Sequence, residues 1–305
     1  MNMTVPPLVA LLFVPGGLFL LAGGLVYEWA DRKLVARFQN RVGPRWFQPL
    51  ADIVKLLAKE EVVPQGVNRF LFHGLPVLAL VGALTSALYV PMLGLAPSYS
   101  FPGDLVVALY LLSLMTLAMG LAGANTLDRF SLVGATRALT QMFSYEAPFL
   151  LAMLGPAIVA GTWQIGEINA YADEHLPMFL TQPIGFIVAM VGLMGKLELP
   201  PFDAPEAETE IVAGALTEYS GRGFGLFRIG RDVELLVGLT LMAAFYLGGL
   251  NDPLDFVLKT GALLLMTAAL QSLFARLRID QTVGLWWRAG VLVALAQIVI
   301  LVILF

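Results

Sequence analysis

Eight long apolar segments alternate with polar ones along the chain. They lie near residues 8–27, 74–95, 105–124, 138–160, 184–199, 233–250, 256–275 and 287–305. A helix needs about 20 residues to cross the hydrocarbon core of a bilayer, and each segment approaches that length. The fifth and sixth are the weakest, because Lys196 and Glu198 interrupt one, and Asp232 and Glu234 begin the other. The pattern predicts an all-α polytopic membrane protein with eight transmembrane helices.

A shorter segment after the first span has a different pattern. After Pro49, apolar side chains follow helical spacing at Leu50, Ile53, Val54 and Leu57, while the charged Asp52, Lys55 and Lys59 lie off that stripe. One apolar face and one charged face are typical of a helix that lies on a membrane surface or under a partner protein. We therefore expect an amphipathic surface helix after the first span.

Basic residues are unequally distributed between alternate loops. Segments 28–70, 125–137, 196–231 and 276–288 hold 17 of the 18 Lys and Arg residues, and only Lys259 lies elsewhere. Loops rich in Lys and Arg face the cytoplasm. The distribution predicts a single integral domain over 1–305 in the cell membrane, with these four loops in the cytoplasm and both termini outside. The first apolar segment has no basic region before it, so we expect a retained span.

Composition agrees with a membrane protein and limits its chemistry. The chain is 58% hydrophobic and 13% charged, with a mean hydropathy of +0.81. It has no cysteine and only two histidines, His73 and His175, so it cannot hold a thiolate-bound iron-sulfur cluster, and a bis-histidine haem is not expected. Metal-ligand clusters, phosphate-binding loops and nucleophile-base pairs are also missing from the sequence. We predict no cofactor and no redox centre in this chain, and we expect membrane lipid but no nucleic acid as a partner.

The densest acidic run follows the fifth span, and carboxylates beside apolar helices are candidates for proton relays. Its acidic residues are Asp203, Glu206, Glu208 and Glu210, with Glu218 further on. Asp203, Glu206 and Glu210 are spaced i, i+3 and i+7, so on a helix they share one face, where mutual repulsion would raise carboxyl pKa values toward neutrality. The alternative is a capping box, because Asp203 precedes Glu206 by three residues and Pro205 suits a first helical turn.

Glu146 is the second candidate for proton transfer. It lies deep in the fourth span, close to Pro148, which weakens the helix. A carboxylate at that depth needs a partner or water, and Lys196 is a possible partner. The alternative is a salt-bridged or snorkelling Glu with a structural role.

A basic run in the first predicted cytoplasmic loop is the candidate docking surface for a soluble redox partner. Its residues are Arg32, Lys33, Arg37, Arg41 and Arg45, continued by Asp52 and Lys55. Electrostatic complementarity guides such docking. The alternative is an anchor for anionic lipid, which uses the same kind of basic loop.

These polar positions together resemble the H-type membrane subunit shared by respiratory complex I and energy-converting membrane-bound NiFe hydrogenases. The resemblance covers nearly the whole chain. Its motifs are the run from Arg32-Lys33 to Gly43-Pro44, Gln48-Pro49-x-Ala51-Asp52-x-x-Lys55-Leu56, Ser144-Tyr145-Glu146, Pro201-Phe202-Asp203-x-Pro205-Glu206-Ala207-Glu208, Thr217-Glu218-Tyr219-Ser220-Gly221 and Ala275-Arg276-Leu277-Arg278-x-Asp280-Gln281.

The resemblance implies a non-redox subunit of a ferredoxin-linked, ion-translocating oxidoreductase complex. Its implied partners are a hydrogenase-like large subunit, a small subunit with iron-sulfur clusters, and antiporter-like membrane subunits, with a NiFe centre possible in the redox arm. The family also implies a proton path through Asp203, Glu206, Glu208, Glu210 and Glu218, with Glu146 in the membrane and Lys196 beside it.

Two departures favour the hydrogenase branch, or its sulfur-reducing relatives, over quinone-reducing enzymes. Segment 43–49 is several residues shorter than in the quinone enzymes, and Gly195-Lys196-Leu197-Glu198-Leu199 replaces their Glu-Thr-Asn-Arg type sequence. A quinone-site subunit of a complex I type NADH dehydrogenase is the alternative. A free-standing secondary transporter is the alternative from another class, although transporters commonly have internal repeats and none is visible here. The sequence does not choose between protons, sulfur compounds and quinone as acceptor, or between H+ and Na+ as the coupled ion.

Overall fold

The computed structural model describes residues 13 and 16–304, and the regular elements of these residues are helices. The longer helices are α2 (Gly17–Phe38), α3 (Gln48–Ala58), α4 (Arg69–Ser86), α5 (Asp104–Asn125), α6 (Arg129–Ala160), α7 (Ile165–Glu174), α9 (Pro183–Lys196), α11 (Gly221–Tyr246), α12 (Pro253–Leu273) and α14 (Val291–Leu304). The shorter ones are α8 (Met178–Thr181), α10 (Glu208–Ile211) and α13 (Ile279–Leu285). The predicted all-α class is confirmed for the part of the chain that the structure describes.

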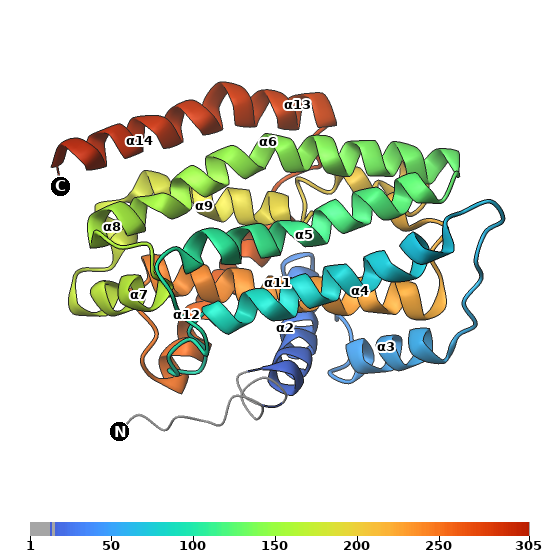
Figure 1. Ribbon diagram of the computed structural model, residues 1–305, viewed down its shortest axis with the longest axis horizontal. Helices are drawn as coiled ribbons and strands as arrows, with labels where there is room; N and C mark the ends of the chain where they lie inside the picture. Colours follow the sequence, from blue (N-terminus) through green and yellow to red (C-terminus); the bar gives the residue numbers. More distant parts are fainter. Residues whose placement is uncertain (1–12, 14–15, 305) are drawn as a thin grey trace.

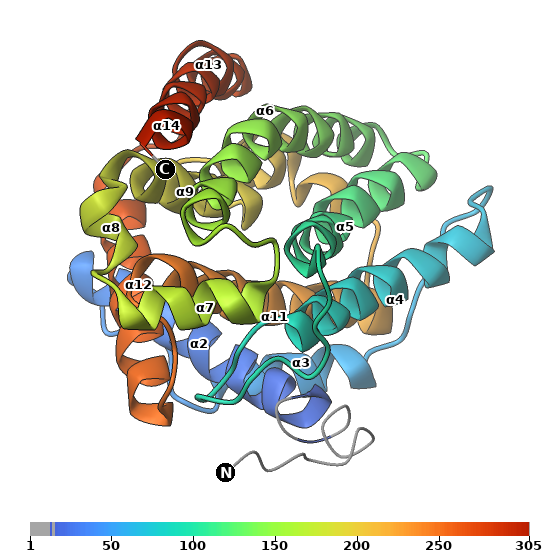
Figure 2. The ribbon, with the colours of Figure 1, turned by 60° about the vertical axis from the view of Figure 1, so that its left-hand side comes forward.

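The long helices form one bundle with α14 on its outside. Helices α4, α5, α6 and α11 lie lengthwise in Figure 1, and α4 packs against both α5 and α11. Helix α6 lies between α5 on one side and α9 on the other. The turned view in Figure 2 shows α13 and α14 lying along the surface of this bundle, where α14 packs on α6 and α9.

The number of membrane spans is confirmed only in part. Five helical segments of the described residues are long and apolar enough to cross a membrane: Arg69–Tyr89, Asp104–Asn125, Arg129–Ala160, Pro253–Leu273 and Ile279–Leu304. Helix α9 is apolar but shorter, and part of the predicted first span falls on residues outside the described part. The count of eight therefore stays a prediction.

Two segments predicted as loops are partly helical. Helix α2 continues to Phe38, ten residues beyond the predicted start of the first loop at Glu28, and α11 begins at Gly221, twelve residues before the predicted start of the sixth span at Val233. Charged residues on both extensions form ion pairs within the chain, for example between Arg228 and Glu28 at 3.6 Å. Hydropathy alone suggested that these charges end the apolar helices. Because the charges are paired, the helices continue through them.

Loops predicted to lie on one side of the membrane meet one another in the structure. At the predicted cytoplasmic end, the Asn125 side chain accepts from the Asn68 backbone at 3.3 Å and donates to the Asn68 carbonyl at 3.1 Å. The Val62 backbone also donates to the Ser220 hydroxyl at 3.3 Å. These contacts join the first predicted cytoplasmic loop to the second and third, so the helix order agrees with the predicted alternation.

The opposite end has its own set of loop contacts. The backbone N–H of Ile165 donates to the Asp104 carboxylate at 2.7 Å, and the backbone N–H of Leu250 donates to the Asn169 side chain at 2.8 Å. All four residues lie in or next to segments predicted to face outside. The bundle thus has two distinct loop layers, one at each end.

The predicted amphipathic helix is confirmed as α3. Proline stands in its first turn, where a missing backbone N–H costs nothing, and Ile53 is buried against the chain. The rest of the apolar stripe is open: Leu50, Val54 and Leu57 remain 52%, 57% and 42% exposed. The stripe therefore keeps most of its apolar surface available to lipid or to a partner.

Candidate functional site

The acidic segment after α9 is an irregular loop, which corrects the prediction of one helical face. A short 3-10 turn covers Ala204–Glu206, α10 covers only Glu208–Ile211, and Ala207 between them has non-helical backbone angles. The Asp203 side chain makes no capping hydrogen bond, so the predicted capping box is not formed either. The break at Ala207 therefore separates the two turns and leaves no continuous helix.

Three acidic side chains of this loop each bind an arginine from a different part of the bundle. Glu206 binds Arg231 of α11 at 2.6 Å, and Glu210 binds Arg137 of α6 at 2.7 Å. Asp203 accepts two hydrogen bonds from Arg276, which follows α12, at 2.9 and 2.5 Å. The predicted repulsion among the three carboxylates is therefore wrong, because three separate guanidinium groups compensate them.

Backbone packing holds the loop close to this position. Gly214 has a φ of +60°, and a Cβ at this residue would lie 2.0 Å from the Pro205 carbonyl oxygen. Only glycine permits both the left-handed conformation and this close approach. The loop consequently folds back on itself.

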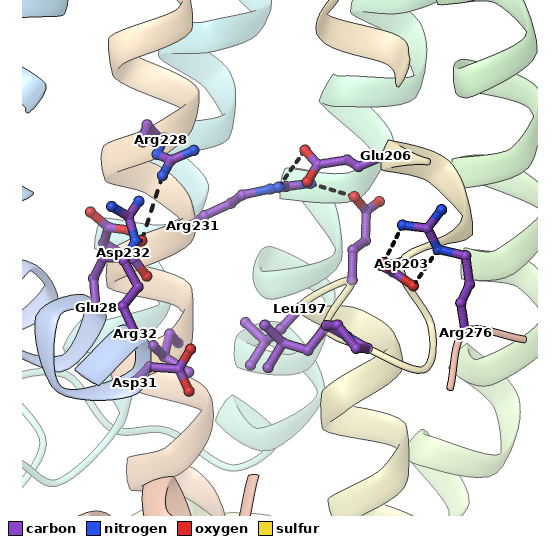
Figure 3. Close-up of a pocket in the computed structure, with 14 residues that line it drawn as sticks. Glu28, Asp31, Arg32, Leu197, Asp203, Glu206, Arg228, Arg231, Asp232 and Arg276 are labelled. Carbon is purple, nitrogen blue, oxygen red and sulfur yellow. Dashed lines mark hydrogen bonds and ion pairs between the residues drawn. The ribbon is translucent and has the colours of Figure 1, made fainter. Parts of the chain in front are cut away.

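A charged cavity of about 680 Å³ lies between this loop and helices α2 and α11. Figure 3 shows Arg231 reaching across it from α11, while Glu28, Asp31 and Arg32 approach from α2. Ten of its fourteen lining residues are charged: Glu28, Asp31, Arg32, Glu198, Asp203, Glu206, Arg228, Arg231, Asp232 and Arg276. Such a lining suits water and small ions.

Arg231 binds two carboxylates of the cavity lining, one of which is nearly buried. Its guanidinium binds Glu206 at the cavity and also Glu198, which is only 5% exposed and follows the end of α9. One oxygen of Glu198, Oε1, is buried without a hydrogen-bond partner among the described residues. Burial raises the pKa of Glu198 to about 7; Arg231 opposes this rise and Glu206 adds to it. Glu198 can therefore change its protonation state near neutral pH.

The predicted pair of Glu146 and Lys196 is present in the interior. The ammonium group of Lys196 lies 3.5 Å from the Glu146 carboxylate and donates to the Ser113 hydroxyl at 2.8 Å. Ser113 in turn donates to Glu146. The Lys196 side chain is fully buried, and the rings of Tyr145 and Phe149 lie 5.8 and 5.7 Å from its nitrogen. A buried ammonium held in this way can exchange a proton only with its immediate neighbours.

Glu234 is a further buried acidic residue, and the sequence pattern did not single it out as a site residue. It is 2% exposed, and its Oε1 has no hydrogen-bond partner among the described residues. Its carboxylate interacts electrostatically with Lys196 and Glu146 of the pair and with Arg231 and Glu198 of the cavity lining. In the sequence, Glu234 stands out only as an acidic residue at the start of the weak sixth span. That position was used to place the span boundary and did not indicate a functional role.

Comparisons with known proteins decide the family. The model of the NADH dehydrogenase family matches residues 9–302. A relative from Carboxydothermus hydrogenoformans, named as the H-type subunit of NADH-quinone oxidoreductase, is 34% identical over 309 residues, covering 96% of this chain and 87% of the relative. A second H-type subunit of that name, from Syntrophobacter fumaroxidans, is 35% identical and covers 93% of this chain and 91% of the relative. The chain belongs to the NADH dehydrogenase family. The resemblance inferred from its polar motifs is confirmed.

A solved structure has the same fold as this NADH dehydrogenase family member. It is a chain of the membrane-bound sulfane sulfur reductase, described as an archaeal respiratory membrane complex, with a TM-score of 0.86. The match covers 96% of this chain and 98% of that chain at 22% sequence identity. At that identity the likeness shows a shared fold.

The structure brings together some of the predicted path residues of this family member and separates others. Asp203 and Glu206 line the charged cavity, whereas Glu210 lines a second hollow with Arg137. Glu218 lines neither and lies partly buried before α11. The side chain of Glu208 is outside the described part of the structure.

The predicted docking residues also divide into two groups. Arg32 binds Glu28 at 2.5 Å and Asp52 at 3.5 Å, and Lys33 donates to the Val42 carbonyl at 2.7 Å, so both stabilise the turn between α2 and α3. A second group is at least partly exposed and available to a partner: Arg37, Arg41, Arg45 and Lys55. The docking role of these residues stays a prediction.

Proposed function

We propose that this chain is the non-redox membrane subunit of a ferredoxin-linked, ion-translocating oxidoreductase complex. In this proposal the complex is a membrane-bound hydrogenase or a sulfur-reducing relative. The chain anchors a peripheral redox arm made of a hydrogenase-like large subunit and a cluster-bearing small subunit. It also joins that arm to antiporter-like membrane subunits. Iron-sulfur clusters, and a NiFe centre in the hydrogenase case, belong to those partners.

The observation that carries the proposal is a succession of ionisable groups from the loop surface into the bundle. It begins at Glu206 and Arg231, continues through the buried Glu198 and Glu234, and ends at the Glu146–Lys196 pair. Each group lies within ion-pairing or electrostatic range of the next. Protons move along such a series when neighbouring groups can exchange them. Electron transfer in a partner subunit docked at the loop would change the protonation of the groups nearest the loop surface.

The charged cavity supports ion coupling more strongly than quinone binding. Pockets that hold a drug-sized organic molecule are lined mainly by apolar and aromatic side chains with a few polar groups. Here Leu197, Leu199, Pro200 and Leu235 are the apolar members of the lining, and the other ten side chains carry ionisable groups. A quinone ring would have to displace water from many ionic groups at high cost.

The second candidate function is that of a quinone-site subunit in a complex I type NADH dehydrogenase. The observation that favours it is the name of the similar relatives, which are H-type subunits of NADH-quinone oxidoreductase at 32–35% identity over most of this chain. Additional apolar walls of a quinone chamber would then have to come from partner subunits.

Membership of the family argues against a free-standing transporter. The matched family covers residues 9–302, which leaves almost no part of the chain for a separate transport domain. A transporter would also function as a single chain, whereas the proposed role requires a redox arm.

Purification of the native complex through a tag on this chain tests the proposal. The proposal expects co-purifying subunits with iron-sulfur clusters, oxidation of reduced ferredoxin, and nickel if the complex is a hydrogenase. Sulfur-compound reduction without nickel would identify the sulfur-reducing relative. A complex that oxidises NADH, reduces quinone and ignores ferredoxin would contradict the proposal and support the second candidate. Recovery of this chain alone in active form would support the transporter.

A further inference from the structure

Gln141 is a buried polar side chain that none of the candidate ionic pairs uses. It lies on α6, it is 0% exposed, and it is five residues before Glu146 on the same helix. Burial of an amide without partners costs free energy, so its hydrogen bonds indicate what it does.

The amide nitrogen of Gln141 binds two separate segments at once. It donates to the Gly195 carbonyl in the last turn of α9 at 3.2 Å and to the Phe202 carbonyl in the acidic loop at 2.6 Å. Both partners are acceptors, so the orientation of the amide is fixed by the contacts themselves. One side chain of α6 therefore connects the end of α9 to the loop.

The two bound carbonyls are adjacent to the residues of the proposed path. Gly195 precedes Lys196, whose ammonium group contacts Ser113 and Glu146, and Phe202 precedes Asp203 at the cavity. Tyr145, one turn after Gln141 on the same face of α6, packs closely under Gly195, where an added Cβ would lie 3.2 Å from its ring. One amide thus contacts the backbone beside Lys196 and the backbone beside Asp203.

The oxygen of the same amide makes no such contact. The Oε1 atom of Gln141 is buried and has no hydrogen-bond partner among the described residues. The two hydrogen bonds of the amide nitrogen are therefore the contacts that define the role of this side chain.

We propose that Gln141 is a positioning residue that couples the location of the acidic loop to the geometry of the Lys196–Glu146 pair. This inference rests on the proposed function. The amide group itself exchanges no proton. It keeps the end of α9 and residue 202 at fixed positions relative to α6, so that a displacement of the loop alters the contact between Lys196 and Glu146.

Ion uptake per electron in inverted vesicles tests this role, beside the amount of assembled complex in the same preparations. Gln141→Leu keeps the side chain's approximate size and removes both hydrogen bonds. We expect it to lower the number of ions moved per electron at least threefold in the complexes that assemble. A purely structural residue would reduce the amount of complex and leave the ratio unchanged.

Gln141→Glu keeps the test decisive if the Leu variant does not assemble. A protonated carboxyl has one O–H donor for the two carbonyls, whereas a carboxylate has none and repels both. We expect the ratio of this variant to approach the wild-type ratio at pH 5.5 and to fall at least threefold below it at pH 8, reversibly within one preparation. A ratio that follows the wild type at both pH values would overturn the proposal.

Gln297→Leu is the matched control. Gln297 is also a buried glutamine, but it lies on α14 and donates to Gln182 at 3.3 Å, away from the loop. We expect a normal ratio in this variant. Glu146→Gln separates the two hypotheses: if it lowers the ratio while Gln141→Leu does not, only the positioning role is wrong, and if neither variant changes the ratio, the Lys196–Glu146 pair takes no part in coupling and the positioning role fails with it.

Discussion

Arg231 compensates the charges of two carboxylates at once. Its guanidinium binds Glu198 and Glu206, and its side chain is only 22% exposed. Removing one partner of a buried ion pair costs about 3 to 5 kcal/mol, because the other charge stays buried without compensation. We therefore expect Arg231→Leu to lower the stability of the chain by an amount on the order of 3 kcal/mol.

The double variant Arg231→Leu with Glu198→Leu should recover part of that loss, because no buried charge is then left alone. The measurement is the apparent melting temperature of the purified complex for both single variants, the double variant and the wild type. Arg222 on the same helix is exposed, so Arg222→Leu is the control. We expect little change in the melting temperature of this variant. Equal effects of Arg231→Leu and Arg222→Leu would show that the paired guanidinium adds no stability.

Glu198 predicts a specific dependence of stability on pH. Its pKa is about 7 in the folded chain and near 4.5 in an unfolded one. Between these values the folded chain binds more protons, so its stability decreases as the pH rises through this window. A glutamine side chain cannot titrate, so Glu198→Gln should gain stability relative to the wild type between pH 5 and pH 8. The measurement is the melting temperature of Glu198→Gln minus that of the wild type at each pH. A difference that stays constant or falls from pH 5 to pH 8 would contradict the assigned protonation of Glu198.

At the scale of elements, helix α3 shows what sequence spacing can predict. Apolar residues at helical intervals and Pro49 in the first turn were enough to place it, since these are local properties. The acidic loop shows the limit of the same reasoning. Its spacing suggested one helical face, but Asp203, Glu206 and Glu210 each bind an arginine far along the chain, 25 to 73 residues away. Residue spacing within a segment gives no information about partners that only the tertiary fold brings close.

The turn between α2 and α3 carries the prediction on docking. Arg37 and Arg41 are at least partly exposed, whereas Arg32 and Lys33 stabilise the turn itself. Arg37→Glu with Arg41→Glu should therefore release the redox arm from the membrane fraction, and more readily at high salt, because exposed contacts are screened. The measurement is the distribution of arm subunits between membrane and soluble fractions. Lys59→Glu, further along the first loop, is a control for charge reversal, and full retention of the arm in the double variant would favour the lipid anchor.

At the scale of the whole molecule, the alternation of loops was predictable and the exact spans were not. The contacts between Asn68 and Asn125 at one end, and between Asp104 and Ile165 at the other, group the loops as the basic residues predicted. Hydropathy did not predict that α2 and α11 extend into the predicted loops, because it counts each charge as unfavourable and does not include the ion pairs that compensate it. The same limitation explains why Glu234 was treated as a span boundary.

The whole molecule also determines what kind of chemistry can be coupled. Ionisable groups extend from the loop surface to Glu146 inside the bundle, while the redox centres of the proposed complex belong to other subunits. In the proposed complex, protonation changes in this chain link electron transfer in the arm to ion movement in the membrane.

The most direct test is the number of ions taken up per electron by inverted vesicles supplied with reduced ferredoxin. Glu146→Gln removes the titratable group of the buried pair while nearly preserving its shape, and Glu206→Gln with Glu210→Gln does the same at the loop. Turnover and assembly are measured in the same preparations. We expect assembled complexes in which the number of ions moved per electron falls severalfold in both variants. An unchanged ratio in both would place the coupling route outside this chain.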